Sequence, residues 1–307
     1  MYSTPDTIDA ALALVSRGGD FAFVAGGTDL LIQRYQGNNN ATHLIDLRRI
    51  EELKRIRADE DSVSIGAGVT LAAMIGNQDL RSRFPTVIEA ARSVASPLIR
   101  SAATIAGNLL CQNRCVYFDQ SEFWRDAVGY CLKCGGDVCI ATGGTKACYS
   151  VFISDIAPVL IVLHARIEYI TGSMRETITV ESLYTGDGRN PHTLPRDAIV
   201  TRIVIPEGNE GNIYFCKIRP RESVDFTNLT LAMRCRGETL SLAASGVGPG
   251  PAVAHIPRDT DTDALATRLL ARTQIIDNLA YGRRYRREML ARLVAVGREK
   301  VADERRE

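Results

Sequence analysis

Six of the eight cysteines of this 307-residue chain lie between Cys111 and Cys148, and the sequence on either side is almost free of cysteine. In a reducing cytosol, cysteines clustered in this way more often hold a metal centre than form disulfides. Soft sulfur ligands suit zinc or an iron–sulfur centre and disfavour hard cations. The segment therefore predicts a metal-binding insert, and the rest of the chain must supply the fold that carries it.

Spacing alone leaves the metal open. Cys131 and Cys134 form a Cys-x-x-Cys pair, which with Cys111 and Cys115 would suggest a zinc knuckle. An iron–sulfur cluster, which also needs four thiolates, is the alternative. Cys216 and Cys235 lie outside the segment in strand-like runs and are interpreted as buried free thiols.

Length and composition restrict the class of protein. The chain exceeds one average domain, so we expect two compact units or one unit with an insertion. Hydrophobic residues make up 45% and charged residues 24%, as in soluble globular proteins, and the net charge of +1 gives no field that favours nucleic acid. We find no secretory signal pattern and no run of about 20 apolar residues. We therefore expect a cytoplasmic protein without a membrane span and without a nucleic-acid partner.

Helix and strand patterns flank the cysteine segment on both sides. Residues 4–17 predict a helix, residues 21–27 a strand that ends in two glycines, and the alternation around 61–65 a hairpin. A second unit is expected to begin between residues 205 and 212. Apolar and basic positions alternate at helical spacing from residue 263 to the end of the chain, which predicts an amphipathic helix.

Two glycine turns predict a binding site for a phosphate-containing ligand. AGGTDLL (25–31) follows a strand and precedes a helical segment, and TIAGNL (104–109) comes about eighty residues later. Glycine permits positive φ and close approach of the backbone, so that successive N–H groups can point at a pyrophosphate. Either turn alone is also compatible with an ordinary tight loop, and neither matches a Rossmann or Walker pattern. Together they could hold the two ends of one dinucleotide.

With these motifs the chain resembles the FAD-binding subunits of the molybdenum hydroxylases, the xanthine dehydrogenase and carbon monoxide dehydrogenase family. The resemblance covers nearly the whole chain: AGGTDLL, IGAGVTL, PLIRSAATIAGNL, SDIAPVLIVLHA, FCKIRPRESVDFTNL and GVGPGP occur in family order. It implies an α+β fold in which residues 1–208 form an FAD-binding domain of the PCMH type, built of two α/β subdomains. Residues 111–150 would be an iron–sulfur insert in it, and residues 209–307 a C-terminal flavoprotein domain of sheet plus helices.

The resemblance also implies the residues that bind FAD. On one side these are Val24, Ala25, Gly26, Gly27, Thr28, Asp29, Leu30 and Leu31, and on the other Thr104, Gly107 and Asn108. Asp155 and Lys217 match positions that reach the flavin half, although Lys217 could equally be a surface lysine. We find no nucleophile–base pattern and expect no catalytic side chain, as in a subunit that passes electrons to cofactors held elsewhere.

The cysteine insert resembles that of one branch of the family, the β subunits of 4-hydroxybenzoyl-CoA reductases. This implies a four-iron four-sulfur cluster held by Cys115, Cys131, Cys139 and Cys148, with Cys134 as an alternative to Cys131. It further implies electron flow from a ferredoxin-like donor through this cluster, FAD and two-iron clusters to molybdenum. The partners would be a molybdenum-cofactor large subunit and a two-iron small subunit in a dimer of heterotrimers. The alternatives are outward electron flow in a purine or N-heterocycle hydroxylase, and a structural zinc insert.

Overall fold

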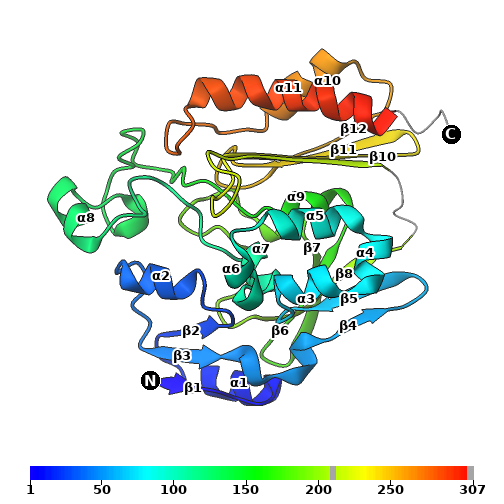
Figure 1. Cartoon of the computed structure of the whole chain (residues 1–307). Coiled ribbons are helices and arrows are strands. Elements are labelled where there is room, and N and C mark those ends of the chain that lie inside the picture. Colours follow the sequence, from blue (N-terminus) through cyan, green and yellow to red (C-terminus); the bar gives the residue numbers. More distant parts are fainter. Residues whose placement is uncertain (208–211, 303–307) are drawn as a thin grey trace.

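The computed structural model describes residues 1–207 and 212–302. Three sheets lie in layers, with a parallel sheet at the N-terminal end, a five-stranded sheet in the middle and a four-stranded sheet at the C-terminal end (Figure 1). The expected α+β fold is confirmed. The expected domain boundary between residues 208 and 209 lies outside the described residues.

The N-terminal sheet is parallel, because a helix connects each pair of consecutive strands. Thr7 begins the first helix by accepting a hydrogen bond from the backbone N–H of Ala10. The elements are β1 (Tyr2–Ser3), α1 (Ile8–Val15), β2 (Phe21–Val24), α2 (Leu30–Tyr35) and β3 (His43–Asp46), followed by the short helices η1 (Leu47–Arg49) and η2 (Glu51–Lys54). Strand β3 lies between β1 and β2, so the first glycine turn starts at an outer strand of this sheet.

The middle sheet is antiparallel, and its first two strands form the expected hairpin. Its strands, in the order β4-β5-β8-β6-β7, are β4 (Ile56–Ala58), β5 (Ser62–Gly66), β8 (Ile199–Pro206), β6 (Arg166–Thr171) and β7 (Met174–Thr179). The accompanying helices are α3 (Leu71–Gly76), α4 (Gln78–Arg83), α5 (Pro85–Ser93), α6 (Pro97–Ala102), α7 (Ile105–Leu109), α9 (Ala157–Val162) and η4 (Glu181–Leu183). Val63 and Ile65 alternate with half-buried serines along β5 and enter the main core, which all of these helices except α6 share.

The C-terminal sheet is also antiparallel, in the order β12-β11-β10-β9. Its elements are β9 (Ile213–Ile218), β10 (Leu229–Arg236), β11 (Thr239–Ser245), β12 (Ala252–Pro257), α10 (Thr262–Leu270) and α11 (Arg283–Ala302). The helices α10 and α11 pack on one face around a second core, and α9 packs on the other face (Figure 1). The prediction of one continuous C-terminal helix was wrong, because residues 271–282 form a loop that separates α10 from α11.

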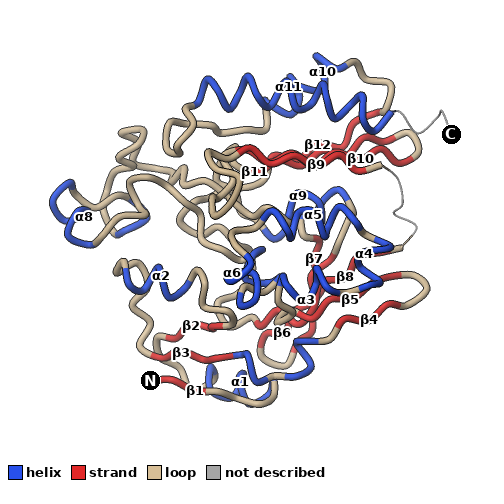
Figure 2. The backbone as a smooth tube through the Cα atoms, viewed as in Figure 1, coloured by secondary structure: helices blue, strands red, loops and turns tan. Residues whose placement is uncertain are grey.

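The cysteine insert is mostly loop and projects from the side of the molecule (Figure 2). Its regular elements are α8 (Glu122–Val128) and the 3-10 turn η3 (Leu132–Cys134). The two ends of the insert meet, because Arg114 and Val151 exchange backbone hydrogen bonds of 2.9 and 2.6 Å. None of the helices in the described part of the chain is long and apolar enough to cross a membrane.

Candidate cofactor sites

The first glycine turn connects β2 to α2 and requires both of its glycines. Gly27 has φ of +70°, a conformation that residues with a side chain rarely adopt. Gly26 approaches the backbone of α6 so closely that an added Cβ would lie 2.0 Å from the carbonyl oxygen of Ala102. The turn can therefore bring backbone N–H groups close to a ligand, as the sequence motif predicts.

The second glycine turn forms the start of α7, directly after α6. The hydroxyl of Thr104 caps this helix by accepting a hydrogen bond of 3.1 Å from the N–H of Gly107. Because Gly26 touches Ala102, the two turns lie next to each other even though some eighty residues separate them in the sequence.

A cleft of about 760 Å³ lies between the two turns and the neighbouring sheets. Pockets of several hundred Å³ with a few polar groups are typical of cofactor sites. Nine of the predicted residues line it: Val24, Ala25, Gly26, Gly27, Thr28, Asp29, Leu30, Thr104 and Gly107. Leu31, Asn108, Asp155 and Lys217 were also predicted to bind FAD but do not line the cleft. Leu31 is half exposed on α2, and the amide oxygen of Asn108 instead accepts a hydrogen bond of 2.7 Å from Ser154.

The cleft is also lined by residues that the motifs did not mark as FAD-binding. They come from α2, η1, η2, the IGAGVTL segment, α6 and β8, and include Gln33, Leu47, Arg48, Leu53, Lys54, Ala67, Gly68, Thr70, Ser101, Ala102, Ile199 and Val200. The IGAGVTL segment could be recognised from the sequence as a family motif. Ile199 and Val200 of β8 could not, because their sequence predicts only an ordinary strand.

Gln33 gives the cleft an unsatisfied polar group. Its side chain is buried, and neither atom of its amide has a hydrogen-bond partner among the described residues. Buried amides in native proteins are almost always paired, so this one is suited to a polar ligand in the cleft. A dinucleotide, with its hydroxyls and ring heteroatoms, fits this requirement as well as the two glycine turns do.

Asp155 and Lys217 form a buried ion pair outside the cleft lining. The Nζ of Lys217 lies 2.7 Å from Oδ2 of Asp155 and also donates to the carbonyl of Ser93 at 2.9 Å. Burial raises the pKa of Asp155 to about 6 and lowers the pKa of Lys217. The pair joins β9 to the residues just before α9, and Lys217 is not a surface lysine.

Four cysteines of the insert surround one hollow. These are Cys115, Cys131, Cys139 and Cys148, all of them buried, and the wall is completed by side chains such as Tyr117, Leu132, Ile140 and Ile276. They are the four cysteines that the family resemblance implied. Cys111 and Cys134 do not line the hollow. Among residues 1–207 and 212–302 no three His, Cys, Asp or Glu side chains form a group that could hold a single metal ion.

The thiols of the hollow differ in acidity. Burial raises the pKa of Cys115 to about 11. The hydrogen-bonded contact between Cys131 and Cys134, whose sulfurs lie 3.8 Å apart, lowers the pKa of Cys131 to about 6. A metal centre binds cysteines as thiolates. Burial disfavours the thiolate form, and the positive charge of a bound metal centre would stabilise it.

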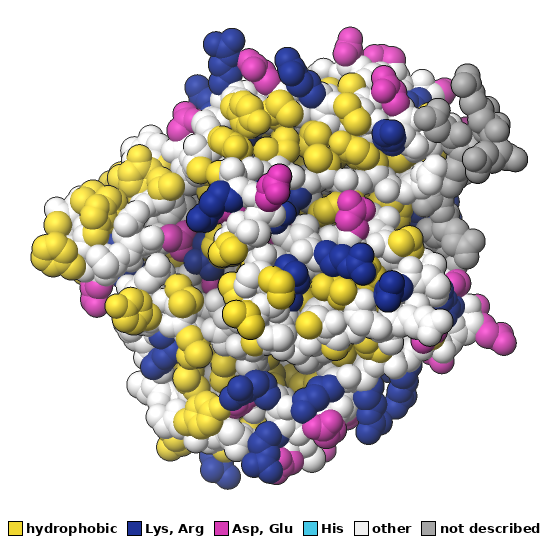
Figure 3. Space-filling view, viewed as in Figure 1, with side chains coloured by type: hydrophobic (Ala, Val, Ile, Leu, Met, Phe, Trp, Pro, Cys, Tyr) yellow, Lys and Arg dark blue, Asp and Glu magenta, His cyan; other side chains and the backbone are white. Residues whose placement is uncertain are grey.

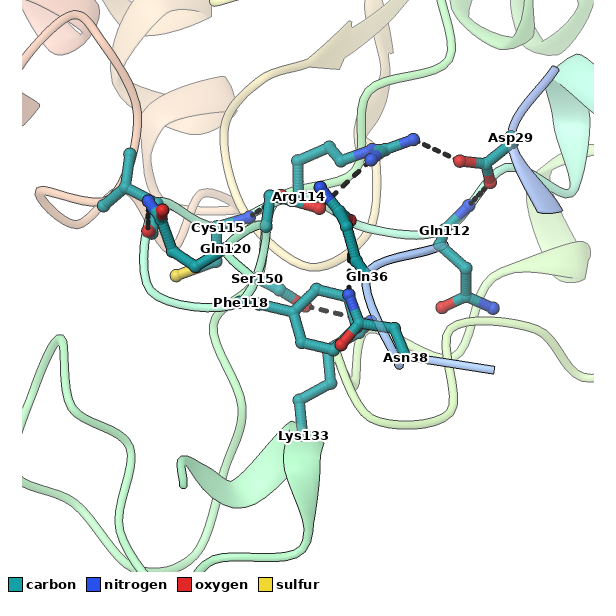
Figure 4. Close-up of polar contacts among 12 residues, drawn as sticks. Asp29, Gln36, Asn38, Gln112, Arg114, Cys115, Phe118, Gln120, Lys133 and Ser150 are labelled. Carbon is teal, nitrogen blue, oxygen red and sulfur yellow. Dashed lines mark hydrogen bonds and ion pairs between the residues drawn. The ribbon is translucent and has the colours of Figure 1, made fainter. Parts of the chain in front are cut away.

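The hollow and the cleft share a wall made by Phe118 and Lys133, which line both. The Nζ of Lys133 lies 5.0 Å from the centre of the Phe118 ring. It donates hydrogen bonds to the carbonyl of Gly188 at 2.5 Å and to the hydroxyl of Ser150 at 3.4 Å. Figure 4 shows Lys133 directed at Phe118 and Ser150, with Cys115 nearby on the same segment as Phe118. One layer of side chains thus separates the hollow from the cleft.

Comparison with known proteins gives consistent matches. The model of the FAD binding domain in molybdopterin dehydrogenase matches residues 1–208. The aldehyde oxidoreductase FAD-binding subunit PaoB of Escherichia coli K12 is 31% identical over 273 residues, which cover 83% of this chain and 82% of that protein. The putative xanthine dehydrogenase FAD-binding subunit XdhB of the same organism is 25% identical over 76% of this chain and 68% of its own length.

The fold is similar to that of a solved subunit. A chain of the Cu,Mo-CO dehydrogenase, in its cyanide-inactivated form, superimposes with a TM-score of 0.76 at 22% identity. The match covers 98% of this chain and 96% of that chain. The expected resemblance in fold to carbon monoxide dehydrogenase flavoproteins is therefore confirmed.

Proposed function

We propose that this chain, which belongs to the family of FAD-binding domains in molybdopterin dehydrogenases, holds FAD in the cleft and a four-iron four-sulfur cluster in the cysteine hollow. The observation that carries the proposal is the shared wall of Phe118 and Lys133 between the two sites. A flavin exchanges one or two electrons and a cluster of this type exchanges one, so two such neighbours make an electron-transfer unit.

Different residues of the cleft would bind different parts of FAD. The backbone N–H groups of the first glycine turn and of the start of α7 would hold the pyrophosphate, because the two turns lie next to each other and both line the cleft. The unsatisfied amide of Gln33 would bind a polar group of the cofactor. We assign the Asp155–Lys217 pair to the stability of the neighbouring backbone, since neither residue lines the cleft.

Three properties of the hollow support a cluster over a single zinc ion. Four thiols surround one space, its wall is largely apolar, and Cys134 stands outside it. Zinc with Zn–S bonds of about 2.3 Å draws its four sulfurs to within about 4 Å of each other. Cys134, whose sulfur lies 3.8 Å from that of Cys131, is outside the hollow, and no group of three in the described residues could hold one ion.

The subunit would work inside a larger enzyme. The relatives are named as FAD-binding subunits, which supports partners that carry the molybdenum cofactor and two-iron clusters. Apolar side chains stand exposed on elements beside the cleft and on the insert, and Figure 3 shows them gathered around α8. They are Leu31, Ile32 and Tyr35 on α2, Leu98 on α6, and Phe123 and Val128 on α8. Such a surface suits burial against another subunit.

For the direction of electron flow we propose the scheme of the 4-hydroxybenzoyl-CoA reductases. Electrons would enter from a ferredoxin-like donor at the insert and leave through FAD toward molybdenum, in a dimer of heterotrimers. The names of the relatives support the opposite direction as the second candidate, since an aldehyde oxidoreductase and a xanthine dehydrogenase take electrons from their substrates. The same sites would serve either direction.

The test is the composition of anaerobically purified protein. We expect about four irons and four acid-labile sulfides, with one FAD, per chain. Zinc without labile sulfide would refute the cluster and leave a flavin subunit with a structural zinc insert. Absence of FAD from a protein with an intact cluster would refute the assignment of the cleft.

A further inference from the structure

A second groove, much more open than the cleft, lies on the outer side of the cysteine hollow. It has a volume of about 1110 Å³. Residues 142–149 of the insert form one wall, and residues 273–276 with the first two turns of α11 form the other. In Figure 1 these are the green insert and the orange start of α11.

The groove is basic. Four cations line it: Lys146, Arg283, Arg284 and Arg287, all exposed. Among its lining residues the only carboxylate is Glu288, which forms an ion pair with Arg284 at 2.8 Å. No ion pair is found for the other three cations within the described residues, although a carboxylate outside the groove, Asp277, accepts the backbone N–H of Arg283. The chain as a whole carries only +1, so this concentration of positive charge is local.

The groove shares a wall with the cysteine hollow. Tyr149 and Ile276 line both, just as Phe118 and Lys133 line both the hollow and the cleft. The hollow therefore lies between the groove and the cleft, with one layer of side chains on each side of it. A partner seated in the groove would approach the hollow more closely than it could approach the cleft.

We propose that this basic groove is the docking site of a small acidic electron-carrier protein. The inference rests on the proposed cluster in the hollow. One electron would pass from the reduced carrier to the subunit through the Tyr149 and Ile276 wall, and no bond would form or break. Exposed cations on long side chains favour a protein partner, because they steer an oppositely charged surface at long range. Among the groove's lining residues none is a buried polar side chain of the kind that fixes a small ligand.

The test is the reduction of the assembled, cluster-loaded enzyme by a reduced acidic two-iron ferredoxin in a stopped-flow instrument. For the wild type we expect a second-order rate that falls steeply as salt is added. The double variant Lys146→Glu/Arg287→Glu should react at least ten times more slowly at low salt and should lose most of the salt dependence. The matched control is Arg57→Glu/Arg175→Glu, two exposed cations on β4 and β7, which should leave the rate unchanged.

Two further measurements distinguish a failure of the docking site from damage to the hollow and from absence of the cluster. Iron and sulfide content must equal that of the wild type, because a loss would mean that the substitutions damaged the hollow; a wild-type enzyme without a cluster would refute the proposed function itself. Photoreduced deazaflavin, a small donor that needs no docking, should reduce the double variant at the wild-type rate. An intact cluster with an unchanged ferredoxin rate overturns the docking site alone. Competition by a micromolar nucleoside diphosphate would overturn it in favour of a small-anion site.

Discussion

Arg114 forms an ion pair with Asp29, so the residue just before the first cysteine of the hollow is tied to the first glycine turn of the cleft (Figure 4). The same guanidinium lies 3.0 Å from Asp119, and its carbon stands 4.6 Å from the ring centre of Phe226. Asp29 also accepts the backbone N–H of Gln112 at 2.9 Å. These contacts explain how an insert built mostly of loop keeps a fixed position against the cleft.

Replacing Arg114 by methionine should loosen the insert. Asp29 and Asp119 would lose their shared cation in a largely buried place, and hydrogen bonds to charged groups contribute about 1.5–3 kcal/mol each. We expect a drop of that order in the free energy of unfolding and weaker retention of FAD, measured by urea unfolding and by equilibrium dialysis. Arg284→Met is the control, because its pair with Glu288 is exposed and should contribute nothing measurable. Equal effects of the two substitutions would contradict the anchoring role.

Gly26→Ala should abolish FAD binding. The new methyl group would lie 2.0 Å from the carbonyl oxygen of Ala102, so one of the two glycine turns must move away from the cleft. The flavin retained per chain after purification is the measurement. Gly76→Ala is the control, since that glycine is helical and an added Cβ meets nothing within 4 Å. Full flavin content in Gly26→Ala protein would show that the turns need not approach so closely.

Cys139→Ser should remove the cluster and leave FAD bound, because Cys139 lines the hollow but not the cleft. Cys134→Ser should keep both cofactors, since Cys134 stands outside the hollow. Iron content and the visible charge-transfer absorption distinguish the two variants, and flavin fluorescence after extraction measures FAD. If Cys134→Ser loses the cluster and Cys131→Ser retains it, the ligand is Cys134 and not Cys131.

Sequence motifs identified the parts of the sites where the backbone itself is the binding element. Residues with a side chain rarely adopt the φ of Gly27, and a Cβ at Gly26 would clash with Ala102, so these positions leave a readable signature. Gln33, Phe118 and Lys133 leave none, because their roles come from which distant segments the fold brings beside them. Asp155 and Lys217 show the reverse case: the motif marked them, but they pair with each other and lie outside the cleft lining.

Lys133→Gln should make the cluster harder to reduce. The Lys133 ammonium lies in the wall of the hollow and partly out of water, where a positive charge favours the addition of an electron. We expect a more negative midpoint potential in a redox titration followed by electron paramagnetic resonance, at unchanged iron content. Lys146→Gln is the control, because its exposed charge is screened by water and salt. A shift of equal size in both variants would mean that Lys133 has no special position.

Lys217→Met should destabilise the chain in a pH-dependent way. In the folded chain burial raises the pKa of Asp155 from 3.8 to about 6, so the folded state binds more protons than the unfolded state between these values. The contribution of Asp155 to stability is therefore complete below about pH 4 and is lost as the pH rises through about 6. Lys217 limits this loss, because its ammonium stabilises the buried carboxylate at 2.7 Å.

Without that cation the pKa of Asp155 should rise further, and the stability deficit of Lys217→Met should grow with pH. At pH 8 we expect about 3–5 kcal/mol, the usual effect of removing one partner from a buried ion pair. At pH 5 the deficit should be clearly smaller, because the carboxyl is then mostly protonated. Urea unfolding at both pH values is the measurement. In the double variant Asp155→Asn/Lys217→Met no buried carboxyl remains to titrate, so the difference between the two pH values should disappear; its persistence would assign the pH dependence to another group.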